Sequence, residues 1–369
     1  MISFFYRLAS VVKRLNRQRL LNRKTLKIKS QIRDISIKYG KSIPENLIKP
    51  EKISRVLIID PLHCYGDSLY VCGLLRALKD DGLTVGIVTN EHLKELYLSA
   101  VNNDQIYAFE DDSAIVKCLR EGWDIAVDLC YMWNQQWGIR ENLVTRLECY
   151  KAVCDPLFLD MPAGIYSHVL DLREERHFGD RLGRIREFIS GKSGRIYPFF
   201  SAKGNFDIFG ENGKIIYINT VGRVKSRCLT QRQVDRICQW ANEQKGVVSY
   251  VYIDGNERIS VKESEIVKIA RTKSFLDACN LISRASAVIS PDTSIVHVAS
   301  ALNIPILAFY CENDKEVYGR SMSEIWAPLS TKSLAVLPQC QKWETGRVSV
   351  SNITDNQIAE GLKWLEHQI

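Results

Sequence analysis

Two patterns of apolar residues alternate along this chain. Short apolar runs predict buried strands of a parallel sheet, and between them apolar residues recur at helical spacing. The run RVLIID at 55–60 is such a strand, and the stretch 65–79 after it carries an apolar helical stripe. The predicted strands are 55–60, 83–89, 105–109, 123–129, 215–219, 247–254, 287–290 and 304–310; the predicted helices are 65–79, 91–98, 114–120, 173–188, 231–244, 275–286, 293–302 and a last one capped at 354–355.

A glycine-rich stretch at 191–213 divides these elements into two series. Alternating strands and helices are typical of a doubly wound parallel sheet, and a chain of 369 residues is long for a single core. We therefore predict an α/β protein with two Rossmann-like domains, an N-terminal one at 50–200 and a C-terminal one at 201–350.

Residues 1–49 form a basic extension to the first domain. They hold 13 Lys and Arg against two acidic residues, whereas the whole chain has a net charge of only +7. Apolar residues between Phe4 and Leu15 fall at helical spacing, so residues 1–30 suit an anionic membrane surface. A helix packed on the body or a solvated arm is the alternative. Because the basic residues are confined to this segment and no nucleic-acid motif appears, nucleic acid is not expected as a partner.

The composition indicates a cytoplasmic protein. The 11 cysteines show no Cys-x-x-Cys pair and no zinc-ligand spacing, which favours reduced thiols. No apolar run reaches the ~18 residues that a membrane span requires, and no signal peptide is recognisable. Attachment to the inner face of the cytoplasmic membrane would then be peripheral.

The stretch 285–310 (ASAVISPDTSIVHVASALNIPILAFY) predicts a strand, a polar turn, a helix and a second strand. Asp292, Thr293 and Ser294 lie where the helix begins, and the backbone N–H groups of a helix N-terminus bind anions readily. His297 follows one turn later and can share that face. These residue types are also ordinary helix caps, so the turn taken alone has a purely structural interpretation.

A second candidate turn lies at Tyr65, Gly66 and Asp67, after the first strand. Gly66 permits a tight strand-to-helix turn, and Asp67 lies near the positive end of the helix dipole. A carboxylate there could accept a proton from a hydroxyl group, or it could simply cap the helix.

Together the two turns resemble the motifs of glycosyltransferase family 9, the heptosyltransferases of the lipopolysaccharide inner core and their relatives. The resemblance runs from Arg55 to Gln368 and implies the GT-B fold, with two Rossmann-like domains facing each other across a cleft. It also implies that residues 351–369 form a helix that returns to the N-terminal domain. Ser294 stands where the family usually has glycine, which leaves less room for a ligand.

The resemblance further assigns roles to individual residues. Asp67 would be the general base, with Tyr65 and Gly66 near the saccharide or glycolipid acceptor. His63 is a local variation from the family pattern; its place on the same loop could bring it to the acceptor pocket, or it is only a loop residue. The nucleotide-sugar donor would bind the C-terminal domain, where the loop 220–227 supplies basic side chains to its phosphates. The implied donor-binding residues are Thr220, Lys225, Arg227, Asp254, Asp292, Thr293, Ser294 and His297, with Arg223 behind the other cations.

The reaction implied is an inverting transfer without a metal or other cofactor, because no Asp-x-Asp motif is present and the helix terminus with its cations can neutralise a diphosphate. Two alternatives remain open at this point. One is a nucleotide-sugar epimerase on the same fold, and the other is a non-catalytic, membrane-attached saccharide-binding protein.

Overall fold

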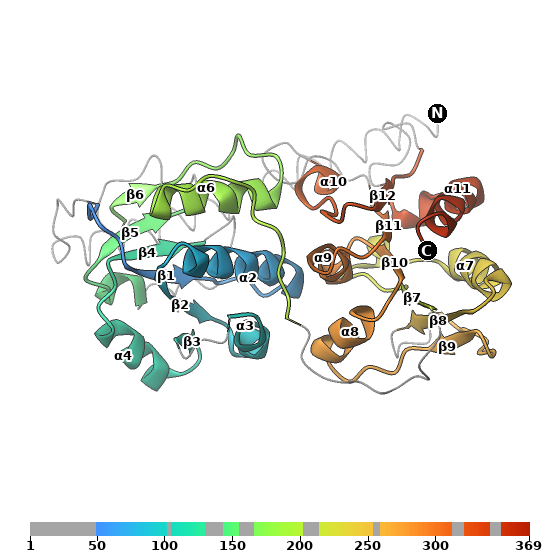
Figure 1. Ribbon diagram of the computed structural model, residues 1–369, viewed down its shortest axis with the longest axis horizontal. Coiled ribbons are helices and arrows are strands. Elements are labelled where there is room, and N and C mark those ends of the chain that lie inside the picture. Colours follow the sequence, from blue (N-terminus) through green and yellow to red (C-terminus); the bar gives the residue numbers. More distant parts are fainter. Residues whose placement is uncertain are drawn as a thin grey trace, which may run out of the picture.

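The computed structural model describes residues 49–101, 105–129, 143–154, 166–201, 214–253, 259–311, 321–339 and 348–369. The basic extension up to residue 48 and the candidate Asp254 therefore lie outside the described residues. Within the described ranges, the strands form two six-stranded parallel sheets, one per domain, and helices cover their faces (Figure 1).

The first sheet lies entirely within residues 50–200, and its strand order is β3-β2-β1-β4-β5-β6. The order reverses between β1 and β4, so the carboxyl ends of these two strands form the crevice where doubly wound sheets bind ligands. Its elements are β1 (Arg55–Ile59), α2 (Tyr65–Asp80), β2 (Thr84–Thr89), α3 (Lys94–Val101), β3 (Ile106–Ala108), α4 (Asp112–Arg120), β4 (Ile125–Asp128), β5 (Tyr150–Val153), β6 (His168–Val169) and α6 (Phe178–Ser190).

The second sheet repeats this plan in the order β12-β11-β10-β7-β8-β9, so its crevice lies between β7 and β10. The prediction of two doubly wound domains is confirmed. The elements are β7 (Lys214–Asn219), α7 (Gln231–Glu243), β8 (Val247–Tyr252), β9 (Val267–Ile269), α8 (Phe275–Ile282), β10 (Ala287–Pro291), α9 (Ser294–Ala301), β11 (Ile306–Phe309), α10 (Met322–Ile325), β12 (Ser333–Val336) and α11 (Asp355–Glu366).

Four short strands, β5, β6, β9 and β12, were not predicted. The strand β5 shows why, because it contains Lys151, a residue type that rarely lies in a buried strand. The Lys151 side chain is buried, and its ammonium group donates to the carbonyl oxygens of Val144 (3.3 Å) and Leu147 (2.9 Å). A lysine can therefore lie in the core when backbone carbonyls satisfy it.

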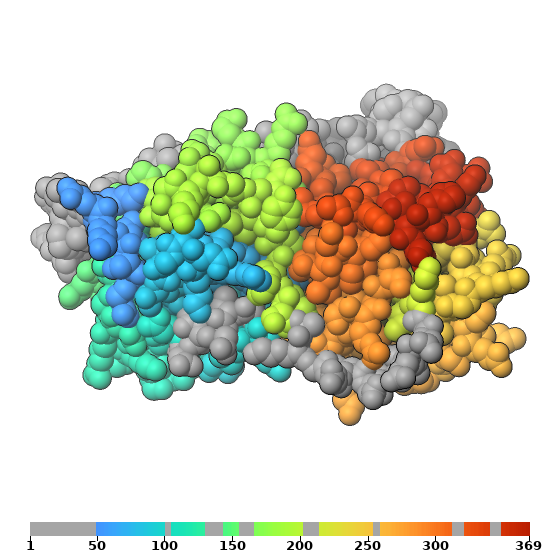
Figure 2. Space-filling view, in the orientation of Figure 1, coloured from blue at the N-terminus to red at the C-terminus, as the bar shows by residue number. Residues whose placement is uncertain are grey.

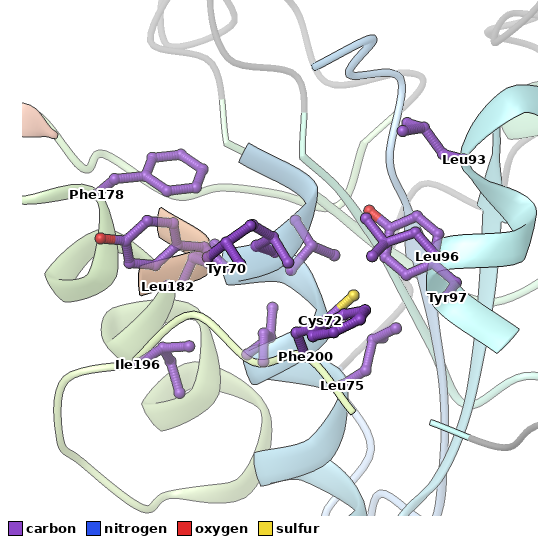
Figure 3. Packing of buried hydrophobic residues seen from close by; sticks show 14 of the residues in the cluster. Tyr70, Cys72, Leu75, Leu93, Leu96, Tyr97, Phe178, Leu182, Ile196 and Phe200 are labelled. Carbon is purple, nitrogen blue, oxygen red and sulfur yellow. The ribbon is translucent and has the colours of Figure 1, made fainter. Parts of the chain in front are cut away.

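Helix α2 is the central helix of the first domain, and it is buried on most of its surface. Tyr70 projects from it toward Phe178 and Leu182 of α6, whereas Cys72 and Leu75 lie on the side that faces Tyr97 of α3 (Figure 3). A helix that is apolar around most of its circumference must lie between two layers. The N-terminal end of α2 is thereby held in a fixed position.

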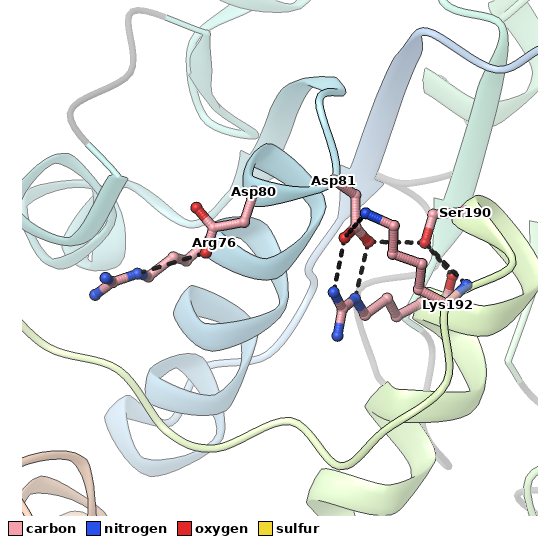
Figure 4. A network of polar contacts seen from close by, with 6 residues as sticks. Arg76, Asp80, Asp81, Ser190 and Lys192 are labelled. Carbon is pink, nitrogen blue, oxygen red and sulfur yellow. Dashed lines mark hydrogen bonds and ion pairs between the residues drawn. The ribbon is translucent and has the colours of Figure 1, made fainter.

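The other end of α2 is fixed by charge. The carboxylate of Asp81 accepts from Arg186 Nε (2.8 Å) and Nη2 (2.7 Å), from Ser190 Oγ (2.8 Å), and lies 3.0 Å from Lys192 Nζ (Figure 4). These bonds lower the pKa of Asp81 below its ordinary range, with Arg186 the largest cause. The helix α6 is therefore tied to the end of α2 through Arg186 and Ser190.

The terminal helix α11 corrects one prediction. Its apolar residues Ile358, Leu362 and Leu365 pack in the core of the C-terminal domain, and Trp240 Nε1 of α7 donates to Glu366 Oε1 (2.6 Å). The expected return to the N-terminal domain is wrong, because this apolar stripe is buried against β11 and α7 instead.

Candidate active site between the two domains

The C-terminal half of the site lies at the crevice between β7 and β10. Thr293 caps α9, with its hydroxyl oxygen accepting from the N–H of Ile295 (3.3 Å). Asn219, at the end of β7, donates from Nδ2 to Ser290 Oγ (3.1 Å) and to Thr293 Oγ1 (3.1 Å). The Asn219 amide therefore holds the turn that the sequence analysis identified as a candidate anion-binding site. Asn219 was not singled out in the sequence, although its position at the end of a switch-point strand is a usable signal.

The remaining polar residues of this half differ in how they are held. The Thr220 hydroxyl donates to the carbonyl of Tyr252 (2.8 Å), which joins the ends of β7 and β8. Asp292 is almost fully buried, and its Oδ2 lies 3.3 Å from Arg227 Nη1. Ser294 is the first residue of α9 and is half-buried.

Three cations follow β7 in the loop, and the structure separates them. Arg227 forms the ion pair with Asp292 described above. Arg223 reaches across to the other domain, where its Nη1 donates to Cys64 Sγ (2.9 Å). The Lys225 side chain is exposed and, within the described ranges, forms no ion pair or side-chain hydrogen bond. The two arginines therefore lie closer than Lys225 to the surface shared by the domains.

The N-terminal half of the site begins where β1 ends. Asp67 lies in the first turn of α2 and is half-buried. Burial raises the pKa of Asp67 to about 7, and the neighbouring carboxylates of Asp60 and Asp292 raise it further in the same direction. The guanidinium groups of Arg223 and Arg227 act in the opposite sense. A carboxyl group from one domain and charged groups from the other thus influence each other directly.

Two more carboxyl groups lie at the crevice of the first sheet. Asp60 follows β1 and Asp128 ends β4; both are fully buried, and they accept hydrogen bonds from the hydroxyls of Tyr97 and Tyr166 respectively. Burial raises the pKa of Asp60 to about 7. The sequence placed both aspartates at strand ends, but their shared crevice follows only from the strand order.

The starts of α2 and α9 meet at Gly66. A Cβ atom at Gly66 would lie 2.9 Å from His297 Cδ2 and 3.4 Å from Ser294 Cα. Glycine is therefore required for the two helices to approach this closely. Beside it, the ring of Tyr65 stacks on Phe275 of α8 with centroids 4.2 Å apart, and exposed His63 stacks on His92 at 5.8 Å.

His297 is buried at this contact. Burial lowers its pKa to about 3, so its imidazole is neutral near pH 7. Its ring lies against Tyr70 (centroids 5.2 Å apart) and Trp326 (5.7 Å), and Nδ1 has no hydrogen-bond partner among the described residues. The structure thus brings Asp67, Asp292, Arg227 and His297 to one interdomain surface.

The chain is similar to known proteins in sequence and in fold. Residues 226–348 match the family model of glycosyltransferase family 9 (heptosyltransferase). The putative lipopolysaccharide heptosyltransferase 4 of Escherichia coli K12 is 24% identical over 330 residues, which cover 84% of this chain and 88% of that protein.

Two solved structures share the fold. The family 9 glycosyl transferase from Veillonella parvula superposes with a TM-score of 0.65 at 15% identity, covering 87% of this chain and 100% of that one. The E. coli ADP-heptose lipopolysaccharide heptosyltransferase II gives 0.63 at 14% identity, covering 85% and 100%.

Two facing Rossmann-like domains define the GT-B fold, and the family-model match indicates a glycosyltransferase. Within that class the chain is a heptosyltransferase-like protein, similar to glycosyltransferase family 9. In the part of the chain that the structure describes, no helix is long and apolar enough to cross a bilayer.

Proposed function

We propose that this protein transfers a sugar from a nucleotide-sugar to a lipopolysaccharide-type or other surface-glycan acceptor, with inversion at the anomeric carbon. The observation that carries the proposal is that Asp67 lies close enough to Asp292 and Arg227 of the other domain for their charges to shift its pKa. The names of the relatives, which include an ADP-heptose transferase, favour a heptose donor.

The donor would bind the C-terminal half of the site. Its diphosphate would lie at the start of α9, near Thr293 and Ser294, where backbone N–H groups face an anion. Arg227, Arg223 and Lys225 are the cations that could balance the charge on the leaving diphosphate. Thr220, Asp292 and His297 would complete the pocket, and Asp254 belongs to the same proposal although it lies outside the described residues.

Asp67 would act as the general base. The acceptor oxygen attacks the anomeric carbon, its proton passes to the Asp67 carboxylate, and the bond from carbon to phosphate oxygen breaks with its electrons on the diphosphate. A pKa of about 7 suits this task, because a base titrating near the working pH is partly ionised and still holds a proton well. His63, Tyr65 and Gly66 lie on the acceptor side, and a single displacement inverts the configuration.

No metal or cofactor is part of the proposed reaction, because the arginines and the start of α9 already supply positive charge. Transfer should then persist in excess chelator at an unchanged rate. A rate that falls with chelator and returns with Mg²⁺ would reject this part of the proposal.

The donor can be identified by thermal shift. A ligand that binds only the folded protein raises Tm. At 100 times its Kd it increases the free energy of unfolding by about 2.7 kcal/mol. We expect one nucleotide-sugar of a panel including ADP-heptose to give the largest shift, and we expect product only when an acceptor saccharide is added. Conversion of donor without acceptor would indicate an epimerase, and absence of any shift would indicate a non-catalytic protein.

We also propose that residues 1–30 hold the protein on an anionic membrane surface, where its glycolipid acceptor is found. The 13 basic residues among the first 49 support this, since each contributes about 1 kcal/mol near an anionic surface. Replacing Arg7, Lys13, Arg14, Arg17 and Arg19 with glutamine should abolish flotation with phosphatidylglycerol vesicles. Equal flotation of both proteins would refute the attachment.

A further inference from the structure

One loop of the C-terminal domain, residues 326–329, lies against the N-terminal domain. The loop is fastened to its own domain because Tyr310 Oη donates to the carbonyl of Trp326 (2.7 Å) and the N–H of Leu329 donates to Ser300 Oγ (3.0 Å). On its other side, the ring of Trp326 packs on Phe178 at the start of α6, with centroids 4.4 Å apart. In Figure 2 the two domains meet where α6 abuts the orange and red elements of the C-terminal domain.

His177 makes the polar contact at this junction. It is the N-cap of α6, and its Nδ1 accepts from the N–H of Gly179 (3.0 Å). Because Nδ1 is an acceptor, the proton must lie on Nε2, which is 3.0 Å from the carbonyl oxygen of Ala327 and donates to it. One buried imidazole therefore caps a helix of the first domain and binds a loop of the second.

The same imidazole lies behind both halves of the candidate site. Its ring contacts Tyr70, with centroids 5.7 Å apart, and Tyr70 lies three residues after Asp67 on α2. Tyr70 in turn contacts His297 on α9, the helix that Thr293 caps. Any shift of α6 relative to the loop 326–329 would be transmitted to the helices that carry the proposed base and the proposed donor site.

We propose that His177 is a positioning residue that holds the two domains at the distance required for transfer. Its role in catalysis rests on the proposed function above, whereas its role in fixing the domains does not. Burial lowers the pKa of His177, which keeps the imidazole in the neutral form that both hydrogen bonds need. The charged groups around it are Arg195, Arg181 and Asp180, and His297 is the neighbouring imidazole.

The two functions of the ring can be separated by substitution. In His177→Asn, the amide oxygen can replace Nδ1 as the cap of α6, but the shorter side chain cannot reach Ala327. We expect a Tm close to that of the unmodified protein and unchanged affinity for ADP or UDP, since the proposed donor site lies in the other domain. We expect kcat to fall about 10- to 100-fold, because a small misplacement of reacting groups has effects of this size.

The domain arrangement gives a readout independent of activity. Dyes on non-canonical amino acids at Val116 of α4 and Arg236 of α7, both exposed, avoid the 11 cysteines and report the interdomain distance by energy transfer. His177→Asn should broaden this distance distribution. Asp111→Asn, which changes the N-cap of α4 away from the junction, is the matched control and should alter neither the distance nor kcat.

A distance distribution and kcat that both stay unchanged in His177→Asn would reduce His177 to a helix cap and overturn the proposal. If that variant fails to fold, His177→Gln can replace it, because the longer amide retains a donor toward Ala327. In His177→Gln the interdomain distance distribution should match that of the wild type, and a broadened distribution would refute the proposal. Failure of wild-type transfer with every donor would reject the proposed function but leave the distance result valid.

Discussion

The loop that joins β1 to α2 and the loop that joins β10 to α9 each follow a strand at the crevice of their own sheet, yet they carry opposite chemistry. The first loop begins at the buried Asp60 and leads to a second carboxyl group, that of Asp67. Its N-cap residue, Cys64, forms no side-chain hydrogen bond to the helix. The second has a threonine cap, an orienting amide from Asn219, and Asp292 paired with Arg227.

This difference shows how one fold, used twice, can provide two halves of one reaction. Clustered carboxyl groups keep their protons to higher pH, so the first loop can hold or release a proton near neutrality. Hydroxyl, amide and guanidinium groups instead favour an anion, which suits the second loop for a diphosphate. In the proposed reaction each loop would supply what the other lacks, so the contact between α2 and α9 would be part of the site.

The strongest test removes the base from the first loop. Asp67→Asn keeps the shape of the side chain but cannot accept a proton, and general-base catalysis contributes typically 10²- to 10⁴-fold. We expect kcat to fall by about that factor while nucleoside diphosphate binding, measured by calorimetry, stays within about twofold. Asp80→Asn at the exposed end of the same helix should retain full activity. Turnover of Asp67→Asn near the wild-type rate would leave the first loop without a chemical role.

The second test compares the cations of the other loop. Arg227→Met removes the charge that pairs with Asp292, so we expect a loss of about 10²- to 10³-fold in kcat together with weaker nucleoside diphosphate binding. Lys225→Met should cost far less, because that side chain is exposed. Steady-state kinetics on both variants decides between the two cations. A larger loss in Lys225→Met would mean that the loop rearranges when the donor binds.

Much of this arrangement could be predicted from the sequence, and the rest could not for physical reasons. The paired turns at Asp67 and Asp292 are local patterns, since a strand end, a polar residue and a helical stripe follow one another in the chain. The ion pair of Arg227 and the reach of Arg223 to Cys64 depend on how two domains face each other, which no local pattern encodes. The same holds for α11, whose apolar stripe suits either domain.

Ser294, which stands where family 9 usually has glycine, shows what the sequence can and cannot indicate about space in the site. Serine in place of glycine was expected to crowd a ligand at the start of α9. In the structure the close neighbour of Ser294 Cα is Gly66, which has no Cβ to collide with it. The space at this crossing is therefore set by a residue of the other domain, and a single motif examined alone could not indicate that.

The third test uses pH. Because the pKa of Asp67 is raised from 3.8 to about 7 in the folded protein, the folded state binds the proton more tightly, and stability falls as pH rises from about 4 to about 7. Asp67→Asn removes this cost, so its Tm should exceed that of the wild type at pH 8 and approach it at pH 4. Asp111→Asn should show the opposite trend, because Ser113 and the backbone of α4 hold the pKa of Asp111 below its usual value. Parallel Tm curves for wild type and Asp67→Asn would contradict the raised pKa.

The smallest effects are expected from replacing the N-cap residues of α9 and α2. Thr293→Ala removes a cap and an acceptor for Asn219, and we expect the free energy of unfolding to fall by about 0.5–2 kcal/mol. Cys64 has the extended backbone of a cap (φ −115°, ψ 123°) but no capping bond, so Cys64→Ser can add one and should not destabilise α2. Urea unfolding of both variants measures the difference. If Thr293→Ala were neutral and Cys64→Ser destabilising, the Thr293 hydroxyl would not stabilise the start of α9, and the thiol of Cys64 would matter mainly as the acceptor for Arg223.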